Sequence, residues 1–150
     1  MSKSGTDRSL NLISFGLFLL LIGAVYLNAP QIFSFIEKFF RDLQLVRVTD
    51  NLFLPAPISN HPEFYSTVEL FSYAYGITQG LLFILGYALD ASLGKRYEFL
   101  SGTVFWIGVG YLFGLLSSRS VAWFHLLSGI IILLGFSIII GALLRRRSGD

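Results

Sequence analysis

The chain has 150 residues, of which 54% are hydrophobic and only 13% are charged, and its formal net charge is +2. Soluble domains usually carry about 25% charged residues, so the composition excludes a disordered chain, a nucleic-acid-binding domain with a basic surface and almost any freely soluble enzyme. Cysteine is absent, which excludes disulfides, thiolate metal sites and cysteine nucleophiles. These features indicate an all-α integral membrane protein.

Long stretches without charge predict the membrane spans. Each is about 18–25 residues long, enough to cross a hydrocarbon core of about 30 Å as a helix. A helix also satisfies every backbone hydrogen-bonding group within the segment, as lipid requires. The sequence therefore predicts a single domain over residues 1–150, a four-transmembrane-helix bundle with spans near 9–27, 67–89, 101–118 and 121–144.

The first span, 9–27, also has features of a cleavable signal peptide, because Lys3 and Arg8 precede its apolar stretch. Its apolar stretch is longer than the usual region of about 7–15 residues, and no small-x-small site precedes Pro30. We therefore expect a retained membrane anchor.

Residues 30–45 have the pattern of an amphipathic interfacial helix. Phenylalanine and isoleucine recur at three- and four-residue spacing, and charged side chains fill the other face. Asn28 and Pro30 are suited to its first turn. We expect this helix to lie at the membrane surface with its phenylalanines toward acyl chains or its own bundle; binding a partner or sensing lipid is the alternative.

Residues 46–66 are predicted to form a Pro-rich outer loop. Asp50-Asn51 lies between short apolar and β-branched stretches and is suited to the turn of a small hairpin. Beyond it, Pro55, Pro57 and Pro62 are expected to prevent regular structure and to give a stiff return path to the second span. The alternative is an ordered docking surface, because four apolar side chains are costly to leave in water: Leu52, Phe53, Leu54 and Ile58.

The distribution of lysine and arginine predicts the orientation. Four spans place both termini and the loop after the second span on one side, with seven basic residues against four on the other. We expect both termini to be cytoplasmic and the location to be the plasma membrane. Three arginines after the last span are expected to contact anionic lipid headgroups: Arg145, Arg146 and Arg147.

Small residues recur along single faces of the last three spans. The Gly110-x-x-x-Gly114 spacing lets two helices approach closely. We expect the following residues to lie at helix–helix contacts: Gly76, Gly80, Gly102, Gly110, Gly114, Ser118 and Gly129.

One group of polar residues is a candidate site. Glu69, Tyr73, Arg119 and His125 all fall near the outer ends of their predicted spans. A carboxylate, an imidazole and a guanidinium at one depth can form a proton relay, a polar lid or a quinone headgroup site. The alternative is structural: Glu69 pairs with Arg119 at the interface, and His125 donates to a backbone carbonyl.

No cofactor, metal site or catalytic residue is predicted. A b-type haem needs two imidazoles on facing helices, and His61, one of the two histidines, lies in the outer loop. A haem shared between two copies through His125, or a bound quinone, remains an alternative. Asp50, His61 and Glu63 share a loop but lack the spacing of metal ligands.

The leading functional hypothesis is a non-enzymatic accessory or scaffolding subunit of a membrane complex, or a self-associating bundle. Its expected partners are membrane lipids and either further copies of the chain or other membrane-protein subunits, with no nucleic acid. Two alternatives are a quinone- or redox-cofactor-interacting protein that uses Glu69, Tyr73 and His125, and an oligomeric channel or carrier with Glu69 or Gln79 facing a shared pore.

Overall fold

A computed structural model describes residues 3–146, which form mostly helices. The elements are α1 (Lys3–Asn28), α2 (Ile32–Arg41), β1 (Leu43–Thr49), β2 (Leu52–Pro57), α3 (Pro62–Ala88), α4 (Leu93–Ser117) and α5 (Trp123–Arg146). Four of the helices, α1, α3, α4 and α5, are long and apolar enough to cross a membrane. The predicted number of spans is thus confirmed at the level of helix length and composition.

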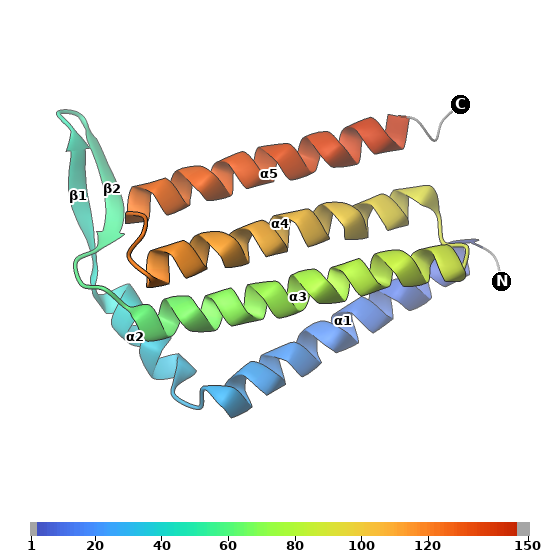
Figure 1. The fold of residues 1–150 in the computed structure, drawn as a ribbon, viewed down its shortest axis with the longest axis horizontal. Coiled ribbons are helices and arrows are strands. Elements are labelled where there is room, and N and C mark those ends of the chain that lie inside the picture. Colours follow the sequence, from blue (N-terminus) through green and yellow to red (C-terminus); the bar gives the residue numbers. More distant parts are fainter. Residues whose placement is uncertain (1–2, 147–150) are drawn as a thin grey trace.

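The four long helices lie in a row in the order α1, α3, α4, α5, each antiparallel to its neighbour (Figure 1). We call the end with both chain termini the terminal end. The opposite end, crossed by α2 and the β-hairpin, is the capped end. The most extensive packing joins α3 to α4, whereas α1 packs mainly against α3 and α5 mainly against α4. The helices α1 and α5 are therefore the two edges of the row.

The hydrophobic core is divided between the two ends of the row. At the capped end, Phe39 of α2 packs with Tyr65 of α3, Phe113 of α4 and Leu126 of α5. At the terminal end, Leu10 of α1 joins buried side chains of α3 and α4. Each end is thus fixed by contacts between elements that are distant in the sequence.

The two tight turns of the row have the same backbone conformation. The residue after the C-cap is left-handed in both: Asp90 after α3 has φ 50° and Arg119 after α4 has φ 58°. The next N–H returns to the last turn of the helix, from Ala91 to the carbonyl of Gly86 (2.9 Å) and from Ser120 to that of Leu115 (2.8 Å). This is the Schellman arrangement, which satisfies the last carbonyls of a helix.

The predicted amphipathic helix is shorter than expected. It ends at Arg41 rather than at residue 45, and β1 begins at Leu43. The reason is that the spacing of the apolar residues changes after α2. From Leu43 to Thr49 apolar and polar residues mostly alternate and several side chains are β-branched, and both features favour a strand.

The expectation that the prolines of the outer loop prevent regular structure was wrong. Asp50 and Asn51 form the turn of an antiparallel hairpin, and Pro55 and Pro57 lie within β2, opposite Leu45 and Leu43. Because the two prolines are two residues apart, both nitrogens face the free edge of the strand, where no ladder hydrogen bond is lost. The carbonyl of Pro55 faces the same edge and accepts a hydrogen bond from Trp123 Nε1 of α5 (2.9 Å).

Candidate functional site

The four residues of the predicted polar cluster lie toward the capped end, but the structure does not join them. Within residues 3–146, no hydrogen bond or ion pair connects the side chains of Glu69, Tyr73, Arg119 and His125. Arg119 is exposed in the α4–α5 turn and His125 is exposed in the first turn of α5. A relay, lid or headgroup role for the four residues remains a prediction.

Glu69 and Tyr73 are brought together on the face of α3 that packs against α4. A Cβ built on Gly114 would lie 2.6 Å from Oε1 of Glu69, and one built on Gly110 would lie 3.0 Å from the ring of Tyr73. The two glycines of α4 therefore make room for the two polar side chains of α3.

The remaining predicted packing residues lie at contacts of differing closeness. Gly76 lies directly against Ile107 of α4, whereas Gly80 and Gly102 make ordinary contacts with Thr103 and Gln79. Ser118 is exposed at the C-cap of α4. The predicted headgroup residues Arg145 and Arg146 fall in the last turn of α5, where the side chains lie outside the described part, as does Arg147.

The α4–α5 contact contains a reciprocal arrangement that the sequence analysis missed. Leu133 of α5 covers Gly108 of α4, with 2.6 Å from its Cδ2 to a Cβ built on that glycine, and Leu112 of α4 covers Gly129 of α5 at 2.8 Å. Further along the same contact, Ser101 Oγ donates to the carbonyl of Ser137 (2.8 Å). Gly108 lies on a different face of α4 from the predicted Gly102, Gly110 and Gly114, so the four-residue spacing does not reveal it.

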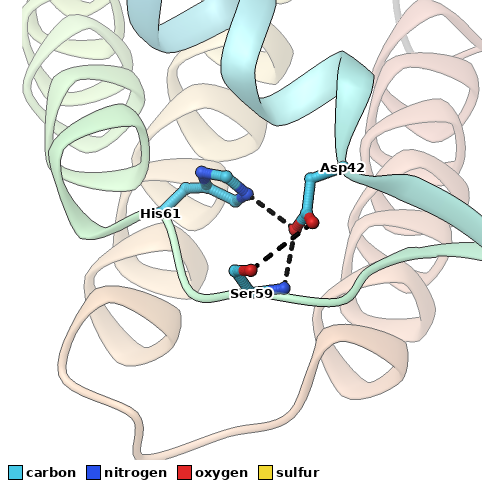
Figure 2. A network of polar contacts seen from close by, with 3 residues as sticks. All are labelled: Asp42, Ser59 and His61. Carbon is cyan, nitrogen blue, oxygen red and sulfur yellow. Dashed lines mark hydrogen bonds and ion pairs between the residues drawn. The ribbon is translucent and has the colours of Figure 1, made fainter.

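A polar network at the capped end joins α2 to α3 (Figure 2). The carboxylate of Asp42, the C-cap residue of α2, accepts a hydrogen bond from the backbone N–H of Ser59 (2.6 Å), and His61 Nε2 lies 2.9 Å from the same Oδ2. The Ser59 hydroxyl donates to Oδ1 at 3.4 Å. The Ser59 N–H and the His61 hydrogen bond together hold the pKa of Asp42 below its ordinary value of 3.8.

We call Asp42, Ser59 and His61 the clasp, because they join the end of α2 to the start of α3, and their hydrogen bonds differ from those of a catalytic triad. In a nucleophilic triad the hydroxyl bonds to the imidazole, whereas here both Ser59 and His61 bond to the carboxylate of Asp42. His61 immediately precedes α3, and its ring packs edge-on against Phe39 of α2 at 5.7 Å between centroids. The clasp therefore fixes the angle at which α2 crosses the end of α3. It could not be predicted from local spacing, because 17 and 19 residues separate Asp42 from its partners.

A second polar cluster lies at the terminal end, around the α3–α4 turn. Arg96 is only 9% exposed; its Nη2 lies 2.9 Å from Oδ1 of Asp90 and its guanidinium lies 4.5 Å from the ring centre of Tyr87. Asp7 of α1 accepts a hydrogen bond from the backbone N–H of Ser92 (3.0 Å). The start of α1 is thus tied to the turn. Arg96 is one of the basic residues of the predicted loop after the second span, and its position in the sequence does not predict its burial.

Lys95 belongs to the wall of a cleft between α1, α3 and α4. It is 9% exposed, pairs with Glu98 (2.8 Å) and lies over the ring of Phe99 (4.7 Å). The cleft has a volume of about 290 Å³; we call it the terminal-end cleft, and define it by Asn11, Ser14, Phe15, Phe18, Tyr75, Gln79, Lys95, Glu98 and Phe99. Gln79, named above as a candidate pore residue, is 8% exposed here, and its amide makes no hydrogen bond within the described residues.

Comparison of the chain with protein-family models, curated proteins and solved structures gives no match.

Proposed function

We propose that this chain is a non-enzymatic subunit of the plasma membrane that associates side by side with further membrane-spanning helices, from copies of itself or from a companion protein. In this proposal α1, α3, α4 and α5 cross the bilayer. The terminal end faces the cytoplasm, because most lysines and arginines lie there. The helix α2 lies along the opposite membrane surface, where its mixed apolar and charged faces are suited to the interface.

The observation that carries the proposal is a contrast between two groups of glycines. Gly108 and Gly129, inside the row, are covered closely by leucines of the neighbouring helix. Gly16 and Gly23 of α1 and Gly135 of α5 have nothing within 4 Å of a built Cβ. A glycine inside a helix costs about 1 kcal/mol relative to alanine, and no contact within this chain offsets that cost at these uncovered positions. Small residues are typical of places where another helix approaches closely.

The two edge helices also present large apolar faces. On α5, Ile131, Ile132 and Ile138 are among the most exposed apolar residues of the described chain, and on α1 so is Leu20. Contact with lipid is sufficient to explain exposed apolar side chains, but it does not explain why glycines lie among them. Edges that combine uncovered glycines with exposed isoleucine and leucine are suited to contact with another helix.

The capped end provides a second reason to expect a partner. The hairpin extends past the end of α5 (Figure 1), and Leu45 and Phe53 on it are 72% and 54% exposed. In the proposed orientation this hairpin lies outside the hydrocarbon core, where apolar side chains in water are unfavourable. A companion subunit or a second copy that covers the hairpin removes this exposure.

The absence of cysteine allows a direct test in native membranes. A Gly135→Cys variant carries a benzophenone maleimide, and irradiation then attaches the probe to whatever lies within its reach. We expect adducts containing a second polypeptide, identified by mass as this chain or another. The matched control is Gly94→Cys, also open around its built Cβ but at the start of α4. Labelled Gly135→Cys and Gly16→Cys variants that form only lipid adducts would contradict the proposal.

A further inference from the structure

We propose that the terminal-end cleft binds the ring of a neutral amphiphile of the quinone class, a single aromatic or quinonoid ring that bears carbonyl or hydroxyl oxygens and an apolar tail. The inference is independent of the proposed association, because every lining residue belongs to one chain. It also differs in place from the quinone hypothesis in the sequence analysis, since the cleft lies at the opposite end of the row from His125 and Glu69.

The aromatic walls and the volume of the cleft favour a single flat ring. Phe15 and Phe18 of α1, Tyr75 of α3 and Phe99 of α4 supply four aromatic rings among the lining side chains. Phe18 and Tyr75 lie 5.5 Å apart in an edge-to-face arrangement, so these two rings of the wall pack against each other. The volume of about 290 Å³ lies just below the usual range of ligand sites, which begins at about 300 Å³. A single substituted ring suits this space better than a larger group.

The uncharged polar side chains in the cleft make no hydrogen bond within the described residues. Gln79 is 92% buried as a residue, and its amide lines the cleft without a hydrogen bond to the described part of the chain. In the part of the chain that the structure describes, the side chains of Asn11, Ser14 and Tyr75 also make no hydrogen bond. These amides and hydroxyls converge on one space and can donate to the oxygen atoms of a ring.

The charges in the cleft favour a neutral ligand over an anionic one. Lys95 is its one cation, and its Nζ lies 2.8 Å from Oε1 of Glu98, which also lines the cleft. The formal charge of the lining is therefore zero. A phosphate placed against Lys95 would also meet the carboxylate of Glu98, and like charges in contact are unfavourable. A carbonyl oxygen meets no such repulsion.

An apolar groove continues the same α1–α3 contact toward the capped end. It holds about 250 Å³ and is lined by Ile22 and Val25 of α1, Ile36 of α2, Val68 of α3 and further apolar side chains. Phe18 lines the cleft and Phe71 lines the groove, and their ring centres lie 6.0 Å apart, so the two spaces are neighbours along α1 and α3. A polar cleft followed by an apolar groove along one helix contact matches a ring with an apolar tail.

The two tryptophans of the chain allow binding to be measured at one end. The ring of Trp106 lies 5.2 Å from that of Tyr75, beside the cleft, whereas Trp123 lies at the capped end. A Trp123→Phe variant in detergent is titrated with a benzoquinone bearing a ten-carbon tail, and the fluorescence of Trp106 is followed. We expect saturable quenching. In the Trp106→Phe variant, Trp123 should show only the weaker, non-saturating quenching that results from partition into the micelle.

Side-chain variants in the Trp123→Phe background distinguish the cleft from the rest of the surface. Gln79→Leu removes one hydrogen bond and should raise the dissociation constant about tenfold. Ser101→Ala, on the α5 side of α4, should leave it unchanged. If Gln79→Leu fails to fold, as judged by its thermal unfolding, Asn11→Leu at the exposed rim replaces it and should weaken binding in the same direction.

Three results would overturn the inference. The first is equal, non-saturating quenching of both tryptophans. The second is saturable quenching that neither Gln79→Leu nor Asn11→Leu weakens. The third is displacement of the quinone by vesicles of an anionic phospholipid but not by those of a zwitterionic one, which would make the cleft a site for anionic headgroups.

Discussion

Alanine at Gly76 tests the closeness of the α3–α4 contact. A Cβ built on Gly76 would lie 2.9 Å from Cγ1 and Cδ1 of Ile107 and 3.0 Å from its backbone nitrogen. The isoleucine side chain can change rotamer, but the backbone of α4 moves only if the two helices separate. Overpacking of this kind costs about 1–3 kcal/mol, and replacing glycine by alanine in a helix returns about 1 kcal/mol. We expect Gly76→Ala to lower the free energy of unfolding by up to about 2 kcal/mol.

Gly80 provides the matched control one turn further along α3. A Cβ there would lie 3.6 Å from Thr103, an ordinary contact, so Gly80→Ala gains the same propensity without the overpacking. The difference between the two variants isolates the overpacking, and we expect Gly80→Ala to be more stable by about 1–3 kcal/mol. The assay is unfolding in mixed micelles as sodium dodecyl sulfate is added, followed by tryptophan fluorescence. Equal stabilities of the two variants would refute the reasoning.

Three further predictions concern the turns, the clasp and the hairpin. Arg119→Gly should raise the free energy of unfolding by about 1 kcal/mol, and with it the thermal unfolding temperature, because glycine adopts the left-handed backbone of this exposed position without strain. Asp90→Gly should bring no such gain, because it leaves the buried Arg96 without its carboxylate partner. The lowered pKa of Asp42 stabilises the folded chain above about pH 4, and this contribution is lost as the pH falls below 3.8 through the folded-state pKa, so Asp42→Asn should flatten that part of the stability–pH profile. Trp123→Phe removes the hydrogen bond to β2, which should lower the stability of the hairpin by about 1 kcal/mol and speed its backbone amide exchange. Unchanged exchange would show that the hairpin is held by other contacts.

The spans could be predicted because they depend on local composition. An uncharged stretch of sufficient length is visible without knowledge of its neighbours, and all four long helices were found this way. Their ends were less accurate: α3 begins at Pro62 and α4 at Leu93, several residues before the predicted 67 and 101. A helix continues past its apolar part into polar residues, and the charge pattern reports only the apolar part.

The residues that define the sites depend on contacts between distant segments. Lys95 and Arg96 have the sequence context of solvated loop charges, yet the approach of α1 and the close turn between α3 and α4 bury both. Asp42 has the context of an ordinary polar residue at the end of a surface helix, and only the return of the hairpin brings His61 to it. Such placements follow from tertiary packing, which spacing within one segment does not encode.

The side-by-side association is tested most directly by the mass of the particle released gently from its own membrane into the gas phase. We expect either a whole multiple of the 16.8 kDa chain or one chain with the added mass of another polypeptide. Particles containing one 16.8 kDa chain and no second polypeptide, under conditions that keep a known membrane dimer intact, would contradict it.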